Sequence, residues 1–146
     1  MGICLMSRLE KSKHKLVGIQ STKQHHIPGV HHIIGDCEWS PEIFSPLIKS
    51  EIITVDDVDT YAGLVMLWRG GIYAGPSSGM TFTHARRPAE HLKEGRILVI
   101  PADSIFAYRD YILKVINQLK DDILKRYPDL REDLSHYVEW LKNYLH

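Results

Sequence analysis

The sequence predicts an α/β protein: an open, mainly parallel sheet with helices on both faces, in a three-layer αβα arrangement. Two observations lead to this fold class. Short apolar runs alternate along the chain with longer segments whose apolar residues recur at helical spacing. The clearest run, residues 96–101, is uninterrupted and rich in branched side chains, which is typical of a parallel strand buried on both faces. Alternating strands and helices favour a sheet that is covered by helices.

The first half of the chain is predicted to contain two more strands. Residues 15–20 form a compact apolar run between polar flanks, and residues 51–55 form another. We expect a short helix over residues 3–9, ahead of the first strand. Residues 21–46 hold three prolines and are expected to form an irregular loop, and loops of that length in a compact domain are usually functional or mobile.

Four helices are expected in the rest of the chain. The first is capped by Asp56 or Asp57 and runs to about Trp68. The second covers residues 80–92, where Pro88 should end or kink it. Pro128 separates two closing helices. Their apolar stripes are Tyr108, Tyr111, Ile112, Val115, Leu119 and Ile123 in one, and Leu130, Leu134, Tyr137, Val138, Leu141 and Leu145 in the other.

Composition narrows the class of protein. The chain has 146 residues, about one domain, and 18 basic residues balance 18 acidic ones, so no global charge attracts nucleic acid or an anionic membrane. No apolar run approaches the roughly 20 residues that span a bilayer. Two cysteines, Cys4 and Cys37, make no disulfide framework. We therefore expect a cytoplasmic protein that contacts neither nucleic acid nor membrane.

The organising feature of the sequence is a turn rich in glycine and serine, Gly70 to Gly79, between two predicted helices. Ser77 or Ser78 is well placed to cap the second of these helices. A helix start of this kind presents backbone N–H groups and small hydroxyls, which suit a planar heteroaromatic ligand or an anion. The alternative is a plain helix start, because many such turns bind nothing.

Five segments of the chain carry a resemblance to a known family. They are Lys15-Leu-Val-Gly-Ile-Gln20, His26-Ile-Pro-Gly-Val30, Glu51-Ile-Ile-Thr-Val-Asp-Asp57, Gly71-Ile-Tyr-Ala-Gly-Pro-Ser-Ser-Gly79 and Arg96-Ile-Leu-Val-Ile-Pro-Ala-Asp-Ser104. In this order and at this spacing they resemble the C-terminal part of the cysteine synthase family of pyridoxal-phosphate-dependent enzymes, which have fold type II and are similar to tryptophan synthase β. The match spans about residues 2–119. We therefore expect a cysteine synthase-like portion over residues 1–119 and a helical extension over residues 120–146.

The resemblance implies a cofactor site. In the family, the first serine of the Ser-Ser-Gly motif hydrogen-bonds the pyridine nitrogen of pyridoxal phosphate, and the residue at that position here is Ser77. The resemblance places five further residues beside the same cofactor: Gly75, Ser78, Gly79, Asp103 and Ser104. The parent reaction it implies is β-replacement on an activated serine, with sulfide as the nucleophile, to give cysteine.

The departures from the family pattern are equally specific. The family's Schiff-base lysine lies in an upstream Ser-x-Lys segment, and its phosphate is held by an upstream Gly-Thr-Gly-Gly-Thr loop; neither segment occurs in this sequence. Ser21-Thr22-Lys23 has a similar composition but belongs to the irregular loop of residues 21–46, the variable loop of the family, so we predict no catalytic residue here. Ala102 is an extra residue and Ile105 replaces a family glycine.

These departures predict a truncated or split portion that is inactive alone and supplies the pyridine-ring side of the pocket. Pyridoxal phosphate would bind only when an N-terminal partner chain supplies the lysine and the phosphate loop. We also expect a homo-oligomer, because a half-enzyme exposes apolar surface. The alternative is a non-catalytic remnant or binding module that keeps the fold without the activity.

A cluster of histidines in the variable loop offers a third hypothesis, a zinc-binding protein. His25, His26, His31 and His32 are followed closely by Asp36, Cys37 and Glu38, and these are residue types that zinc takes as ligands. The spacing is irregular, and adjacent histidines rarely point at the same ion. We therefore predict solvated loop histidines and no metal site. Arg86 and Arg87 are likewise expected to face solvent.

Overall fold

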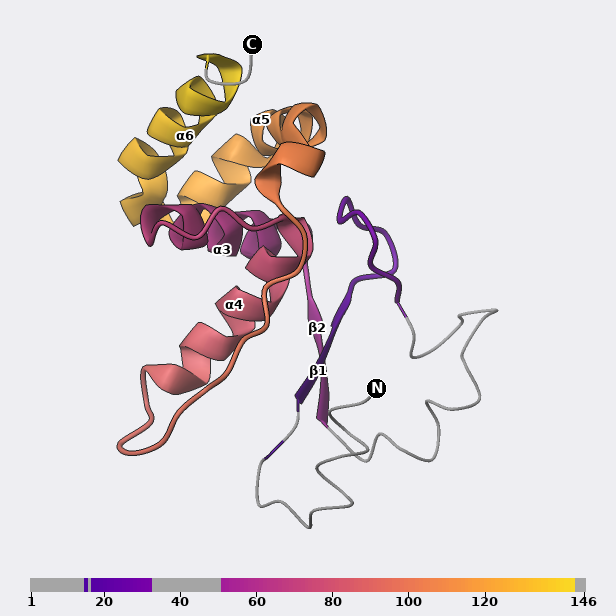
Figure 1. The fold of residues 1–146 in the computed structure, drawn as a ribbon, viewed down its shortest axis with the longest axis vertical. Helices are drawn as coiled ribbons and strands as arrows, with labels where there is room; N and C mark the ends of the chain where they lie inside the picture. Colours follow the sequence, from indigo (N-terminus) through magenta and orange to yellow (C-terminus); the bar gives the residue numbers. More distant parts are fainter. Residues whose placement is uncertain (1–14, 16, 33–50, 144–146) are drawn as a thin grey trace.

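In the computed structural model, the described residues are 15, 17–32 and 51–143 (Figure 1). Strands β1 (Val17–Ser21) and β2 (Glu51–Val55) pair in parallel, with Val17 opposite Glu51 and Ser21 opposite Val55. Both predicted strands are therefore confirmed. The predicted helix over residues 3–9 and the part of the expected loop from residue 33 to 46 lie outside the described residues.

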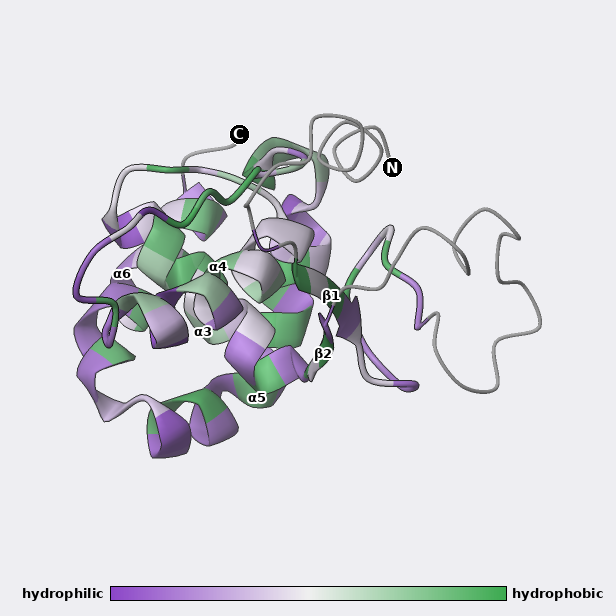
Figure 2. Ribbon diagram, turned by 90° about the horizontal axis from the view of Figure 1, so that it is seen from below, coloured by the Kyte–Doolittle hydropathy of each residue, from purple (hydrophilic) through white to green (hydrophobic). Residues whose placement is uncertain are grey.

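The described part of the chain is α/β, with a two-stranded parallel sheet and four helices. The helices are α3 (Asp57–Arg69), α4 (Pro76–Ala89), α5 (Arg109–Arg126) and α6 (Arg131–Asn143). Figures 1 and 2 show them gathered on one side of the two strands. The expected third layer is not seen among the described residues.

The predicted strand over residues 96–101 is not formed. This segment runs extended beside α4 and joins no described strand (Figure 1). The sequence pattern indicates a buried strand, but a strand exists only when a neighbour pairs with its backbone. Neither β1 nor β2 lies next to it. The prediction was wrong for the described chain because it assumed a neighbouring strand.

Helix α3 forms the centre of the hydrophobic core, because it is buried almost all round. Tyr61, Leu64 and Trp68 are completely buried, and the Trp68 ring packs edge-on against Tyr137 of α6 at 5.6 Å. The Trp68 indole N–H donates to the carbonyl oxygen of Ala74 at 3.3 Å. This bond ties the core to the glycine-serine turn.

Helices α3 and α4 cross at two glycines. A Cβ on Gly63 would lie 1.9 Å from Thr83 Oγ1, and a Cβ on Gly79 would lie 2.3 Å from the Thr60 carbonyl oxygen. Only a residue without a side chain lets two helix backbones approach this closely. The crossing therefore fixes the direction of α4 relative to α3.

The start of α4 differs from the prediction. Gly75 is the N-cap, in an extended conformation, and Pro76 is the first helical residue. Ser77 and Ser78 lie inside the first turn, so neither of them caps the helix. Proline is favoured at the first helical position because its missing N–H has no helical partner there. Pro88 lies one residue before the end of α4 and interrupts little of it.

The C-terminal helices share the core of the rest of the protein. The cysteine synthase-like portion was expected to end at residue 119. Ile116 lies before this position and Ile123 and Leu134 lie after it, and all three are fully buried in one cluster with α3. Arg109, at the start of α5, donates from Nε to the Leu141 carbonyl at 2.7 Å and from Nη2 to the Lys142 carbonyl at 2.9 Å. These bonds satisfy carbonyl groups at the end of α6.

Candidate functional site

The glycine-serine turn and the loop after residue 101 meet at the start of α4. Ser78 Oγ accepts a hydrogen bond from the Ala102 N–H at 2.8 Å and donates to the Ala102 carbonyl at 2.7 Å. The Gly75 N–H also donates to this carbonyl, at 3.4 Å. Ala74 and Ser104 form an isolated antiparallel bridge. Two segments that the sequence analysis expected at one place are thus side by side.

Ser77 occupies a different position from Ser78. Its hydroxyl oxygen, like those of Ser21 and Thr60, is shielded from solvent and has no hydrogen-bond partner among the described residues. A buried hydroxyl without a partner is costly, and its presence in a native structure calls for an explanation. Ser77 is the second residue of α4, where backbone N–H groups have no partner within the helix. An acceptor placed at this helix start would satisfy the hydroxyl.

Asp103 closes the loop against the turn. It has a φ of 61°, in the left-handed region, which Asp tolerates better than most residues. A Cβ on Gly75 would come within 2.9 Å of Asp103 Cβ and 3.6 Å of Tyr108 Cδ2, so the glycine permits this approach. The Tyr108 hydroxyl donates to Asp103 Oδ2 at 3.4 Å. Ser104 Oγ accepts from the Phe106 N–H at 3.3 Å and caps a short 3-10 turn.

The structure therefore separates the six expected site residues into two groups. Five of them lie around the contact between the glycine-serine turn and the loop after residue 101: Gly75, Ser77, Ser78, Asp103 and Ser104. Gly79 is instead buried at the crossing of α3 and α4. Its missing side chain is explained by helix packing.

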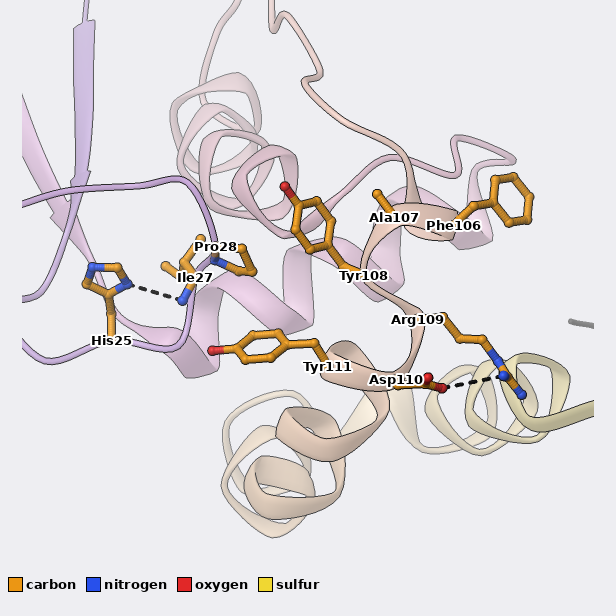
Figure 3. Close-up of a pocket in the computed structure, with 9 residues that line it drawn as sticks. All are labelled: His25, Ile27, Pro28, Phe106, Ala107, Tyr108, Arg109, Asp110 and Tyr111. Atoms are coloured by element: carbon orange, nitrogen blue, oxygen red, sulfur yellow. Dashed lines mark hydrogen bonds and ion pairs between the residues drawn. The ribbon is translucent and has the colours of Figure 1, made fainter.

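An open cleft lies beside this contact (Figure 3). Its volume is about 680 Å³, and it separates the loop of residues 25–28 from the start of α5. Tyr111 points toward that loop, whereas Phe106 points away from it. Tyr108 lines the cleft and its hydroxyl donates to Asp103 of the loop, so the two places share a wall. The lining residues are His25, Ile27, Pro28, Phe106, Ala107, Tyr108, Arg109, Asp110 and Tyr111.

Sequence reasoning named only part of this cleft. It identified the Ile27-Pro28 turn through the family resemblance and His25 in the histidine cluster, but placed Tyr108 and Tyr111 on the apolar stripe of a helix. Tyr111 is 39% exposed whereas its neighbour Ile112 is completely buried, so the apolar stripe alone did not distinguish the two. Burial is the main cause that lowers the pKa of His25, and the charge of Asp57 acts in the opposite direction.

Three of the four loop histidines, His25, His26 and His32, have a ring nitrogen within hydrogen-bond distance of another group of the protein. The His26 N–H donates to both carboxylate oxygens of Asp57, at 3.0 and 2.9 Å, and His26 Nδ1 lies 2.7 Å from Asp57 Oδ2. His32 Nδ1 lies 2.7 Å from the Ser21 carbonyl oxygen. No group of three potential ligands could hold a metal among the described residues. Asp36, Cys37 and Glu38 lie outside them.

A separate ionic cluster joins α3, α4 and α5 around the nearly buried carboxylate of Asp59. Arg87 is paired with this carboxylate, Arg126 Nη1 lies 2.8 Å from Oδ1, and the Tyr127 hydroxyl donates to Oδ1 at 2.7 Å. Burial opposes ionisation, but these hydrogen bonds and charges prevail and lower the pKa of Asp59. Arg87 is exposed, as expected, and its guanidinium also pairs with Asp59 across α3 and α4. The cluster stabilises the fold, since its groups satisfy one another.

Comparison with known proteins yields no match: no family model fits the chain, and no curated protein is similar to it. None of the helices in the described ranges is long and apolar enough to cross a membrane.

Proposed function

We propose that this chain is the C-terminal portion of a cysteine synthase-like enzyme and supplies the pyridine-ring wall of a pyridoxal phosphate pocket. The observation that carries the proposal is the Ser77 hydroxyl. It is buried and without a partner, at a helix start beside the Ala102–Ser104 loop. A pyridine nitrogen is an acceptor that would satisfy it.

The residues at the site fit such a ring. A serine hydroxyl is neutral and donates one hydrogen bond, so it holds a ring nitrogen without protonating it. The Ser78 hydroxyl both donates to and accepts from the Ala102 backbone. Of the two adjacent serines, only Ser77 therefore has a hydroxyl without a partner among the described residues. Asp103 and Ser104 belong to the loop that meets the glycine-serine turn, and Tyr108 is hydrogen-bonded to Asp103. When bound, the cofactor would supply an electron sink for β-replacement on an activated serine.

This chain would orient the ring while a complementary N-terminal chain holds the phosphate and provides the Schiff-base lysine. The sequence contains neither the Ser-x-Lys segment nor the glycine-rich phosphate loop of the family. The extended segment 96–101 would complete a parallel sheet in the assembled protein, and the expected three-layer arrangement would belong to that assembly. We also propose that the assembly is a homo-oligomer of such pairs.

A second candidate is a binding module without catalytic activity. The observation that favours it is the shielding of the Ser77 hydroxyl, because a ligand reaches this atom only if neighbouring groups move. In that case the turn would serve only to anchor the Ala102–Ser104 loop.

Reconstitution separates the two candidates. The chain is co-expressed with the N-terminal protein from its own cells that carries the lysine segment and phosphate loop, and the complex is purified. We expect a visible absorption band from one bound pyridoxal phosphate per pair, and cysteine formation from an activated serine and sulfide. A stable pair that binds no pyridoxal phosphate would leave the binding module as the correct reading.

A further inference from the structure

The cleft between the loop of residues 25–28 and the start of α5 is not needed for the proposed cofactor contact at Ser77. Its volume of about 680 Å³ lies within the range of roughly 300–1,000 Å³ that small-molecule sites of proteins occupy. Ser77 does not line this cleft. The cleft is therefore a candidate for a second ligand site.

Flat and apolar side chains form much of the lining. Tyr108 and Tyr111 lie about one helical turn apart at the start of α5, and Ile27 and Pro28 line the cleft from the loop. Figure 3 shows the Tyr111 ring extending toward that loop. An aromatic ring packs favourably against another aromatic ring, either stacked or edge-on. The lining therefore favours a ligand that is itself an aromatic ring.

The charged groups that border the cleft are engaged elsewhere. Arg109 donates from Nε and Nη2 to carbonyl groups at the end of α6, and its Nη1 lies 3.4 Å from Asp110 Oδ1. His25 Nδ1 accepts from the Ile27 N–H at 3.1 Å, and burial lowers the pKa of His25, so its ring is uncharged at neutral pH. A charged ligand would lose its hydration here and gain no ion pair in return. The site therefore favours an uncharged ligand.

Tyr111 carries a polar group that is available to such a ligand. Its side chain is 39% exposed, and its hydroxyl makes no hydrogen bond to another described residue. The Tyr108 hydroxyl, in contrast, donates to Asp103. A phenol hydroxyl both donates and accepts, so it suits an amide, a carbonyl or a hydroxyl group.

We infer that the cleft binds an uncharged aromatic compound that bears one hydrogen-bonding group. Its ring packs against Tyr108 and Tyr111, and its polar group bonds the Tyr111 hydroxyl. This site is independent of the proposed cofactor site, since it takes an uncharged ligand and is formed by this chain on its own.

The experiment titrates the full chain with three small probes and follows binding by nuclear magnetic resonance. Benzamide is uncharged and aromatic, benzoate keeps the ring but carries a negative charge, and cyclohexanecarboxamide keeps the amide without the aromatic ring. We expect benzamide to bind with a Kd on the order of 1 mM, as suits so small a ligand. Each of the other two probes should bind at least about fivefold more weakly. No binding of benzamide, or equal binding of either other probe, would overturn the inference.

Variants then test whether benzamide occupies this cleft. Tyr111→Phe keeps the ring and removes the hydroxyl, so it should weaken binding about two- to tenfold, the effect of one neutral hydrogen bond. Tyr111→Ala also removes the ring and should weaken binding about tenfold or more. Leu92→Ala, at a leucine 46% exposed outside the cleft, is the control and should bind as the native chain does.

Circular dichroism establishes that the variants are folded. In the native chain, magnetisation should pass from the Tyr108 and Tyr111 ring protons to the bound benzamide. Unchanged affinity in Tyr111→Phe, or no such transfer, would contradict the assignment of the ligand to this cleft.

Discussion

The hydroxyl of Ser78 holds both polar groups of the Ala102 backbone, accepting from its N–H at 2.8 Å and donating to its carbonyl at 2.7 Å. One side chain thereby joins the start of α4 to a loop 24 residues further along the chain. The neighbouring Ser77 hydroxyl has no partner in the described structure. The two adjacent serines thus differ: the Ser78 hydroxyl joins two segments of the fold, and the Ser77 hydroxyl is buried without a partner among the described residues.

Ser78→Ala should destabilise the chain by about 0.5–1.5 kcal/mol for each hydrogen bond lost, because the Ala102 N–H loses its partner and the Ala102 carbonyl keeps only the longer bond from the Gly75 N–H. Ser77→Ala is the matched control and should change stability by less than about 0.5 kcal/mol, since no hydrogen bond is lost. Urea unfolding followed by circular dichroism measures both. Equal losses in the two variants would show that Ser77 also has a structural bond.

Gly79→Ala should be destabilising by about 1–3 kcal/mol or more, because its Cβ would lie 2.3 Å from the Thr60 carbonyl oxygen. Gly70→Ala is the control: Gly70 has a φ of −80° and its nearest neighbour would lie 3.3 Å away. Thermal unfolding of the two variants provides the measurement. A harmless Gly79→Ala would mean that α3 and α4 are not in close contact at this point.

Asp59→Asn should reduce stability by about 2 kcal/mol at neutral pH. This lies below the range for fully buried pairs because both arginines are half exposed. The pKa of Asp59 is lowered by folding, so its stabilisation is present above the ordinary aspartate range and is lost as pH falls through the folded-state pKa.

The pH dependence of unfolding provides the check on this cluster. The native chain should lose stability on acidification, and Asp59→Asn should lose less over the same range. Asp110→Asn, at a residue whose carboxylate is 88% exposed, is the control and should follow the native curve. Parallel curves for native chain and Asp59→Asn would contradict the ionic role of Asp59.

The chain alone should form no stoichiometric Schiff base with pyridoxal phosphate, because it lacks the lysine segment and phosphate loop of the family. Mixing with the cofactor, reducing with borohydride and mapping the product by mass spectrometry tests this expectation. Unfolded chain treated in the same way gives the background of surface lysines. One fully modified lysine in the folded chain only, Lys23 for example, would contradict it.

Local signals were sufficient to predict much of the fold. Residues 51–55 form the predicted strand, and Asp56 caps α3 by accepting from the Asp59 N–H, as the short polar run after an apolar strand indicates. The start of α4 was misassigned because the serines outweighed Pro76, although proline at a first helical position carried the correct signal. The bounds of these elements depend on residues that are adjacent in the chain, and such residues can be read directly from the sequence.

Features that depend on distant contacts were not predictable in this way. Residues 96–101 have the composition of a strand, but no described strand pairs with them. The pairing of Arg87 with Asp59 requires α3 and α4 to cross, and the sequence does not reveal that geometry. At the site, the family resemblance placed Gly75 and Asp103 beside one cofactor, whereas their direct approach and the different surroundings of Ser77 and Ser78 required coordinates.

The most direct measurement is the activity of Ser77→Asp in the complex reconstituted with the complementary chain. A carboxylate would stabilise the protonated form of the ring nitrogen, so we expect cofactor to remain bound while β-replacement falls well below the level of the native complex. Ser77→Ala should lose one neutral hydrogen bond, about 0.5–1.5 kcal/mol of cofactor binding. Full activity of Ser77→Asp, with cofactor bound, would contradict the account, because Ser77 would then be no more than a residue in the first turn of a helix.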